Sequence, residues 1–361
     1  MKNSIGSSVI FTLFGESHQD YIGGVLDGLT PGIKVDEEFL KSQLEKRRPS
    51  LNTDTSRIEK DDYQILSGVY NGYTTGSPIA LIIENNNVRS EDYNLDIPRP
   101  SHSDYVSYVK YHGYSDLRGG GHFSGRVTAP IVALGSICIK ALENKGIKIA
   151  THILKCGQVN DFPFKDYKKE IDLVNQKKVP VIDNIEEELE KEILKYKEDK
   201  DSIGGIIQTA IIGLPVGVGE PWFSSLEGVI SNAVFSIGGI KGIEFGEGFN
   251  FSNGSGKSLN DCYHLEDGEI KLSSNHNGGI NAGISNGNPI VFNMAVKPTP
   301  SIASKQESVN LKTNEEVELE IKGRHDPAII RRICVVISSM LAIVLADELE
   351  KKFGVDFFLD K

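Results

Sequence analysis

Cysteine is scarce in this chain and never closely spaced. Cys138, Cys156, Cys262 and Cys334 are spread through 361 residues, and no two form a CxxC pair. This spacing argues against a zinc site, and disulfide frameworks are typical of short secreted chains instead. We therefore expect four reduced thiols in a cytoplasmic protein.

Long apolar runs and an excess of positive charge are also missing. The most apolar stretch, residues 333–346, spans 14 residues, whereas a membrane helix needs about 20. We expect a buried core helix there and no membrane association, and the short apolar run at residues 9–14 does not form a signal-peptide core. The net charge of −11 argues against a nucleic-acid partner. An anionic small molecule is compatible with it, since a site needs only a local cluster of cations.

Several familiar catalytic signatures are absent as well. The chain has no HExxH or GxSxG motif, so neither a metallohydrolase nor a serine hydrolase is expected, and we predict no metal site. Residues 253–258 end like a phosphate-binding P-loop, but Phe251 stands where that motif requires its first glycine. Residues 213–219 are glycine-rich but lack the GxGxxG spacing of a dinucleotide site.

Hydrophobic periodicity predicts a mixture of strands and helices. We expect strands at residues 5–14, 63–69, 79–84, 204–212 and 290–296, and helices at 36–48, 128–143, 226–235 and 327–353. Residues 160–202 are rich in Lys, Glu and Asp, and we interpret them as exposed surface with a charged helix near 185–196. Residues 250–275 are interpreted as a polar loop or hairpin. The absence of a βαβ rhythm favours an α+β fold with helices packed on mostly antiparallel sheets, in a single domain over residues 1–361.

Histidine, arginine and glycine gather in a few segments. Gly15–Glu16–Ser17–His18 follows a predicted strand, where a glycine permits a sharp turn close to a ligand. Taken alone, a histidine in such a turn is more often structural than catalytic. Lys46–Arg47–Arg48 ends a predicted helix, and the helix dipole would explain one of these cations better than three. Adjacent arginines also suit a phosphate or carboxylate ligand, which guanidinium binds in bidentate fashion.

Further segments combine such residues with stiff or glycine-rich backbone. Residues 99–105 form a rigid turn that presents His102, and residues 118–126 place three glycines beside Arg, His and Ser before a predicted helix. We favour a loop that binds an anion or a planar ring over a merely flexible one, because helix N-termini attract phosphate. Residues 275–287 are glycine-dense, and residues 297–301 are stiffened by two prolines. Asp326 precedes Pro327 at the expected start of the last helix, where it would serve as the N-cap.

Taken together and in this order, the segments resemble the chorismate synthase family. The resemblance runs from about Ile5 to Asp347 and rests on residues 14–18, 47–49, 65–69, 74–76, 82–85, 118–121, 283–287, 297–301 and 323–327. It implies a β-α-β sandwich, a homotetramer, reduced FMN as cofactor and a place in the shikimate pathway to aromatic amino acids. The implied reaction is a 1,4-elimination of phosphate from 5-enolpyruvylshikimate 3-phosphate, giving chorismate without net redox change.

The resemblance also implies roles for individual residues. His18 would protonate the leaving phosphate, His102 would hold the flavin in its reactive protonation state, and Asp326 would act as the base. The substrate's phosphate and carboxylates would be held by arginines, namely Arg47, Arg48, Arg126 and Arg332. The implied FMN-binding residues are His122, Phe123, Ser124, Gly238, Gly239, Ala282, Gly283, Lys297, Pro298, Thr299, Pro300, Ser301 and Arg324.

The chain departs from the family pattern at a few of these positions. Gln19 and Ala282 replace usual glycines, Lys46 and Thr53 replace usual arginines, and His122 stands where many members have arginine. A flavin-binding relative without lyase activity is therefore the alternative function. A third hypothesis is a bifunctional enzyme that reduces its own flavin with NADPH. We see no reductase segment and expect an external source of reduced flavin.

Overall fold

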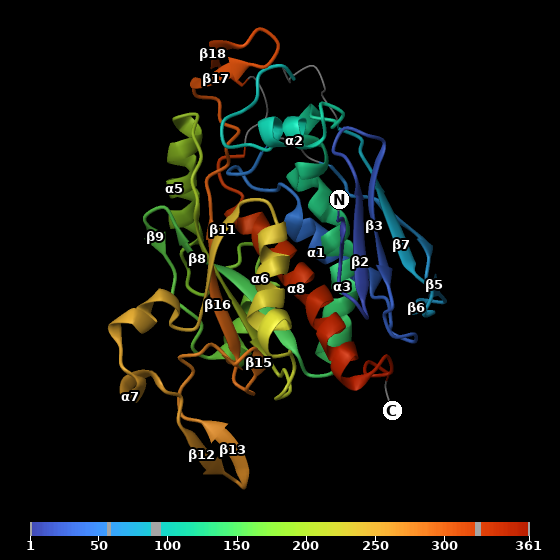
Figure 1. Cartoon of the computed structure of the whole chain (residues 1–361), viewed down its shortest axis with the longest axis vertical. Coiled ribbons are helices and arrows are strands. Elements are labelled where there is room, and N and C mark those ends of the chain that lie inside the picture. The colour runs from blue at the N-terminus through green and yellow to red at the C-terminus, as the bar shows by residue number, and fades with distance from the viewer. Residues whose placement is uncertain (1, 56–58, 88–94, 322–325, 360–361) are drawn as a thin grey trace.

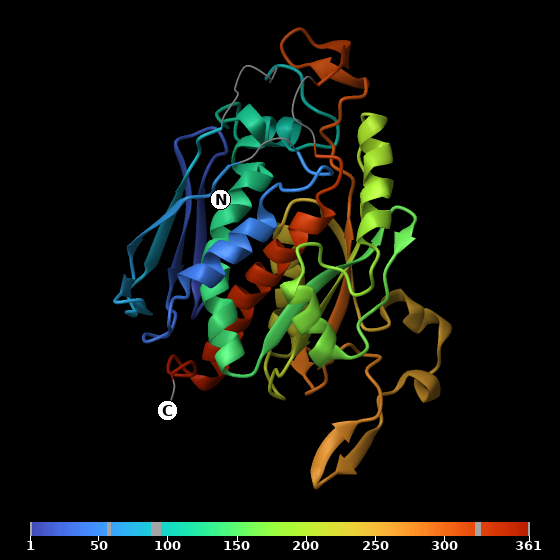
Figure 2. The ribbon, with the colours of Figure 1, turned by 180° about the vertical axis from the view of Figure 1, so that it is seen from behind.

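Two five-stranded antiparallel sheets face each other across a layer of helices (Figures 1 and 2). The computed structural model describes residues 2–55, 59–87, 95–321 and 326–359. The strand orders are β1-β2-β3-β7-β4 in the first sheet and β11-β16-β10-β8-β9 in the second. This arrangement confirms the predicted α+β fold, with antiparallel sheets around helices. The single-domain organisation stays a prediction.

The first sheet turns one face toward the helices. Its strands are β1 (Ser4–Ile5), β2 (Ile10–Gly15), β3 (Tyr21–Asp27), β4 (Tyr63–Ser67) and β7 (Ile79–Glu84), with a small hairpin of β5 (Val69–Tyr70) and β6 (Tyr73–Thr74). Ile79, Leu81 and Ile83 alternate along β7 and are buried, as expected for the covered face of a sheet.

The single strand predicted over residues 5–14 is wrong, because the chain reverses within it. Gly6 has a φ of +98°, and the carboxylate of Asp347 accepts hydrogen bonds from the backbone N–H groups of residues 7, 8 and 9. The contact to Asp347 comes from the far end of the sequence, so local periodicity did not reveal it. Strand β3 was not predicted either, since Gly23 and Gly24 weaken its apolar pattern.

The helices between the sheets are α1 (Glu37–Arg47), α3 (Ala129–Asn144), α6 (Leu226–Ser236) and α8 (Ile330–Phe353). Asp36 caps α1 by accepting a hydrogen bond from the N–H of Phe39, as its sequence predicts. Helix α8 contains the apolar stretch 333–346, which is buried throughout and confirms the predicted core helix. The predicted start of this helix is wrong: Ile329 is the N-cap residue, and the Asp326 carboxylate pairs with Arg332 instead of capping.

The second sheet contains β8 (Lys148–Cys156), β9 (Val159–Asn160), β10 (Gly205–Ile212), β11 (Ile240–Phe245) and β16 (Ile290–Val296). Helix α4 (Tyr167–Gln176) covers its outer face, where Ile171 and Val174 pack on Ala150 and Ala210. The expected charged helix is α5 (Glu186–Glu198), and it buries Leu189 and Ile193. Contrary to the prediction, residues 160–202 are therefore not exposed throughout, because each of these two helices buries an apolar stripe. The many charged neighbours hid these stripes in the sequence.

The remaining helices, turns and strands are short. They are α2 (Asp104–Lys110), the 3-10 turns 118–123, 125–128, 222–224 and 248–253, α7 (Gly256–Leu259), and the short strand pairs β12 (Tyr263–Glu266) with β13 (Glu269–Leu272), β14 (Ile280–Asn281) with β15 (Ile284–Ser285), and β17 (Gln306–Asn310) with β18 (Glu315–Leu319). The hairpin β12–β13 projects away from the body (Figure 1), which confirms the hairpin expected within residues 250–275. All four cysteines are free, as predicted, and Cys262 is exposed.

Among the described residues, one helical stretch, 118–144, has the length and apolar composition of a membrane span. Within its most apolar 18-residue window, 78% of the residues are buried inside the protein. Such burial is that of a core helix in a soluble protein, because a membrane-spanning helix presents much of its surface to lipid.

Candidate active site

A cavity of about 620 Å³ opens between the N-terminal strands, helix α3 and the loops at one end of the second sheet. This volume lies within the range of roughly 300–1,000 Å³ that small-molecule sites occupy. Its wall comes from residues 2–5, 101–103, 122–125, 236–239 and 297–300, with contributions from α3 and α8. The predicted residues that line it are His102, His122, Phe123, Ser124, Gly238, Gly239, Lys297, Pro298, Thr299 and Pro300.

Lys297 connects three parts of the cavity wall. Its backbone N–H donates to the carbonyl of Gly239 over 2.8 Å, and its Nζ donates to the carbonyl of Ser101 over 2.7 Å. Burial, with a smaller contribution from the Lys241 charge, lowers the pKa of Lys297. Nearby, the Thr299 hydroxyl is buried without a hydrogen-bond partner. The wall therefore offers an ammonium group to a bound molecule.

The structure does not bring every predicted cofactor residue to this cavity. Gly283 lies at the start of α6, where its carbonyl accepts from the N–H of Leu226, whereas Gly238 and Gly239 follow the end of the same helix. An 11-residue helix is roughly 16 Å long, so Ala282 and Gly283 lie far from the other predicted residues. Ser301 is not part of the cavity wall, and Arg324 lies outside the described residues.

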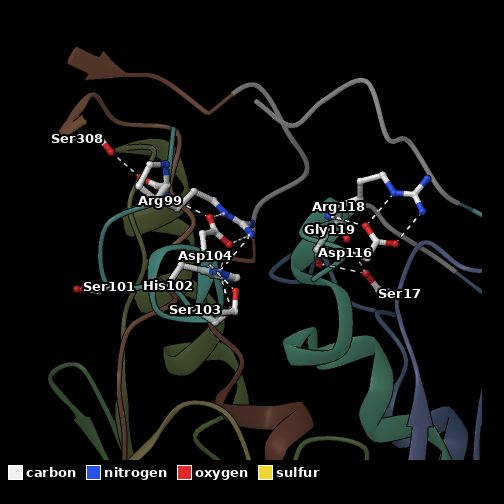
Figure 3. Close-up of polar contacts among 12 residues, drawn as sticks. Ser17, Arg99, Ser101, His102, Ser103, Asp104, Asp116, Arg118, Gly119 and Ser308 are labelled. Atoms are coloured by element: carbon white, nitrogen blue, oxygen red, sulfur yellow. Dashed lines mark hydrogen bonds and ion pairs between the residues drawn. The ribbon is translucent and has the colours of Figure 1, made fainter. Parts of the chain in front are cut away.

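His102 is held by a buried ion pair (Figure 3). Its Nδ1 lies 2.7 Å from Oδ1 of Asp104, and Arg99 contacts the same carboxylate through Nε at 2.7 Å and Nη2 at 2.8 Å. Burial opposes ionisation of this carboxylate, but hydrogen bonds from Arg99 and His102 lower the pKa of Asp104 well below its usual range. His102 therefore faces the cavity with a fixed ring orientation.

His18 and His102 meet the same glycine-rich loop. A Cβ atom on Gly119 would lie 2.4 Å from Nε2 of His18, and one on Gly120 would lie 3.2 Å from Cε1 of His102. Both glycines have positive φ, +60° and +88°, so they provide close approach and a left-handed turn together. The loop is pinned to the His18 turn by Ser17, which donates to the carbonyls of Arg118 and Gly119 (Figure 3). His122 adds a contact between its Nδ1 and the Gly15 carbonyl at 2.8 Å.

Two predicted substrate arginines share one buried carboxylate. Asp61 pairs with Arg47 over 2.8 Å and with Arg126, and its side chain is fully buried. Burial would raise the pKa of Asp61, but Arg47 and Arg126 lower it overall. Arg126 also donates to Oδ1 of Asn85 over 2.9 Å. Because the Gly125 carbonyl lies 3.5 Å from Nη1 of Arg47 and Gly125 lines the cavity, this cluster adjoins the cavity wall.

The start of α8 adds a second layer of ion pairs. Arg332 pairs with Asp326, and Arg331 pairs with Asp54 and donates to the backbone carbonyls of residues 46 and 48. Burial lowers the pKa of Arg332 to about 10, against the opposing charge of Asp54. The Nε groups of Arg47 and Arg332 are buried without a partner, as is Oδ1 of Asp326. Arg48 differs from these, since its side chain is partly exposed and pairs with Glu45 at 3.4 Å.

The departures from the family pattern differ in how well their surroundings accommodate them. Gln19 is exposed, is not among the residues with positive φ, and donates from Nε2 to Asp116 over 3.1 Å. The turn that carries His18 therefore has room for this side chain. Ala282 adopts a φ of +51°, which is unfavourable for a residue with a Cβ atom, and Thr53 is buried.

Sequence reasoning missed four residues that organise the site. Arg99 and Asp104 were recognised only as part of the turn around His102, although their spacing from that histidine was visible. Asn85 donates to the carbonyls of Glu16 and Gln19 and accepts from Arg126, so it joins the His18 turn to the arginine cluster. Asp61 gave no signal, because one aspartate in a polar segment is unremarkable until the fold surrounds it with arginines.

Comparison with known proteins agrees with the geometry. The family model described as chorismate synthase matches residues 9–349. The chorismate synthases of Pyrococcus abyssi and Methanocaldococcus jannaschii are 41% and 42% identical to this chain, over 95% and 96% of it and 96% of each relative. A crystal structure of chorismate synthase superimposes with a TM-score of 0.77 at 30% identity, covering 97% of this chain and 94% of that one. Since these matches span nearly the whole sequence, the chain belongs to the chorismate synthase family, phosphate-eliminating lyases of the shikimate pathway to aromatic amino acids.

Proposed function

We propose that the cavity binds reduced FMN and that His18, His102 and Asp326 handle the protons while phosphate is eliminated from 5-enolpyruvylshikimate 3-phosphate. The observation that carries this proposal is the meeting of two histidines on successive glycines of one loop, beside the cavity and the arginine cluster. Histidines with unrelated structural roles are not expected to approach the same loop from separate parts of the chain.

The cavity wall suits a planar ring that carries a phosphate. Cβ atoms placed on Gly125 and Gly238 would meet nothing within 4 Å, so a ligand has access to the backbone there. Phe123 is 45% exposed and its ring suits stacking, while Lys297 offers a cationic donor. Members of this family use reduced FMN. The chemistry that the reduced cofactor supplies is transient electron density, lent and recovered without net redox change.

Burial and hydrogen-bond partners support the proposed proton-transfer roles. His18 is 8% exposed, so it would deliver a proton to the leaving phosphate with little competition from water. One oxygen of Asp326 is fixed by Arg332, and the other is buried without a partner, as a base that awaits a substrate proton requires. General acid–base groups of this kind each contribute about 10²–10⁴-fold to a rate.

The arginines would hold the substrate's phosphate and carboxylates. Asp61 orients the guanidinium groups of Arg47 and Arg126 and offsets part of their charge. The buried Nε groups of Arg47 and Arg332 lack partners, and an unsatisfied buried donor costs about 1–3 kcal/mol. An anion that accepted hydrogen bonds from these groups would remove that cost, which favours an anionic substrate at this position.

The test is an anaerobic assay of purified protein with 5-enolpyruvylshikimate 3-phosphate and chemically reduced FMN, with phosphate and chorismate measured together. Equal release of both, absent without reduced flavin, is the expected result. His102→Ala and Asp326→Ala should each lower turnover strongly, and full activity in either variant would remove that residue from the mechanism.

The same assay separates the alternatives. Flavin binding without release of either product would favour a relative that lacks lyase activity. We propose that reduced flavin comes from an external source in the cytoplasm. Turnover sustained by oxidised FMN and NADPH alone would instead indicate an enzyme that reduces its own flavin.

We further propose a homotetramer, because two apolar surfaces of the described chain lack a cover. The outer face of the first sheet carries Ile10, Phe14, Tyr21, Val25 and Ile82, and none of the described helices lies on that side (Figures 1 and 2). On the projecting hairpin β12–β13, one face consists of two cross-strand pairs, Tyr263 with Leu272 and Leu265 with Ile270. Two separate self-complementary surfaces are what a tetramer with two kinds of twofold interface needs.

The hairpin offers a clean test of this assembly. Leu265 and Ile270 are 75% and 72% exposed in the single chain, and their replacement by serine should reduce the mass measured by light scattering below that of four chains. In the matched control, serine replaces His264 and Lys271 instead, because these two residues form a cross-strand pair on the opposite face of the hairpin. An unchanged mass in the Leu265→Ser, Ile270→Ser variant would exclude the hairpin from the assembly.

A further inference from the structure

We propose that Asp104 is a positioning residue for His102, and that together with Arg99 it fixes which ring nitrogen carries the proton. The inference rests on the proposed role of His102 and adds two residues to it. Asp104 and Arg99 do not line the cavity, so they act through the histidine.

The hydrogen-bond partners determine the tautomer. Nδ1 of His102 lies 2.7 Å from a carboxylate oxygen of Asp104, and an ionised carboxylate only accepts hydrogen bonds. Nη2 of Arg99 and Oγ of Ser103 each lie 3.2 Å from the same nitrogen, but Nη2 donates to Oδ1 of Asp104 over the shorter distance of 2.8 Å, so the closest partner of Nδ1 is the carboxylate. Nδ1 therefore carries the proton and donates it to Asp104. The remaining nitrogen, Nε2, lies on the side of Gly120, 3.6 Å from the position of a Cβ atom there.

Arg99 in turn fixes the carboxylate. Oδ2 of Asp104 accepts from the backbone N–H and from Nε of Arg99, over 3.0 and 2.7 Å, and Oδ1 accepts from Nη2 over 2.8 Å. Because all three donors belong to one residue, the carboxylate has no freedom to rotate away from His102. The side chains of Arg99 and Asp104 are only 9% and 10% exposed, so water competes little for these bonds.

The consequence is that His102 acts on the cavity through Nε2 alone. As a neutral ring it accepts a hydrogen bond at Nε2, and as a cation it donates one there. His102 thus has a defined polarity toward the ligand in each charge state, which a freely tautomerising histidine lacks. Carboxylates that orient a functional histidine through a hydrogen bond are common around metal sites and in nucleophilic triads.

Asp104→Asn should reverse this tautomer. Two donors of Arg99, its backbone N–H and Nε, face the position of Oδ2, whereas one, Nη2, faces that of Oδ1. The amide oxygen therefore takes the position of Oδ2, and the amide NH₂ takes that of Oδ1. Nδ1 of His102 then faces a donor and must accept, which moves the ring proton to Nε2. Solid-state ¹⁵N spectra of histidine-labelled protein, assigned with His102→Ala, report the protonated nitrogen directly and need no turnover.

Turnover supplies the second readout. We expect Asp104→Asn to lower kcat by about 10²-fold with KM changed less than threefold, in the range of a lost acid–base group. In the His102→Ala background the same substitution should have no further effect, because Asp104 acts through His102. The matched control is Asp261→Asn, which alters a second aspartate–histidine pair outside the cavity. In this pair Oδ1 of Asp261 lies 3.0 Å from Nδ1 of His276. This control should keep wild-type turnover.

The outcomes are distinct. A proton that stays on Nδ1 in Asp104→Asn, a kcat within threefold of wild type, or an equal loss in the His102→Ala background would each overturn the proposal. If the wild-type protein and Asp261→Asn both lacked lyase activity, the proposed function would fail. In that case the ¹⁵N spectra would still decide whether Asp104 sets the tautomer.

Discussion

Gly119→Ala is expected to lower kcat by about 10²-fold while reducing stability only moderately. The added Cβ would lie 2.4 Å from Nε2 of His18 and 2.8 Å from Oγ of Ser17, whereas ordinary contacts begin near 3.4 Å. The His18 ring would have to retreat by about 1 Å. A misplacement of this size in a catalytic group costs on the order of 10²-fold in rate.

Backbone strain must be separated from this displacement. Alanine at a left-handed position costs roughly 1–2 kcal/mol by itself. Gly146, at the far end of α3, has a φ of +76° and no atom within 4 Å of its Cβ position, so Gly146→Ala has the strain without the clash. Gly120→Ala is an intermediate case, since its Cβ would lie 3.2 Å from the His102 ring.

The measurement is kcat under anaerobic conditions for the three variants, together with the free energy of unfolding in urea. The expected order of activity loss is Gly119→Ala, then Gly120→Ala, then Gly146→Ala with none. A Gly119→Ala enzyme with kcat within threefold of wild type would refute the argument that this loop holds His18 in place. An equal loss in Gly146→Ala would attribute the effect to strain alone.

Three other predictions concern charge, thiols and the turn beside His18. Asp61→Asn should destabilise the protein at neutral pH by about 3 kcal/mol, since two buried arginines lose their shared carboxylate. In the folded protein the pKa of Asp61 is lowered below its unfolded value of about 3.9. Urea titrations should therefore show the full difference in free energy of unfolding between wild type and Asp61→Asn above pH ~4, and this difference should shrink as the pH falls through the folded pKa. At pH 8 one thiol per chain, Cys262, should react rapidly with a disulfide reagent and four after unfolding, because the other three are buried; rapid reaction of more than one native thiol would contradict this. Gln19→Gly should keep kcat within threefold, because an exposed hydrogen bond to Asp116 contributes about 1 kcal/mol or less, and a larger loss would mean that the loop depends on Gln19.

Local sequence was sufficient where the physical cause is local. Asp36 predicted the start of α1, because an N-cap bond spans three residues. The apolar stretch 333–346 predicted a buried helix, since it is too short for a membrane and too apolar for a surface. Gly119 and Gly120 marked a loop with close backbone approach, and the ordered motifs indicated the family that the comparisons establish.

Local sequence failed where a distant partner changes the outcome. The strand predicted over residues 5–14 is interrupted because the Asp347 carboxylate holds a turn from the other end of the chain. Asp326 had the spacing of a helix cap, but the fold gives it a cation as partner. The buried stripe of α4 was hidden among lysines and acids, because apolar residues at helical spacing need a sheet beside them to become a core.

The sequence alone determined the types of chemical group available to this protein: histidines, arginines and glycine-rich turns in a family-specific order. The tertiary structure decided what those groups face. It set His18 and His102 on neighbouring glycines of one loop, gave Arg47 and Arg126 a common buried carboxylate, and turned Nδ1 of His102 toward Asp104. These contacts depend on distances between residues far apart in the chain, and only the packing of two sheets around the helices fixes such distances.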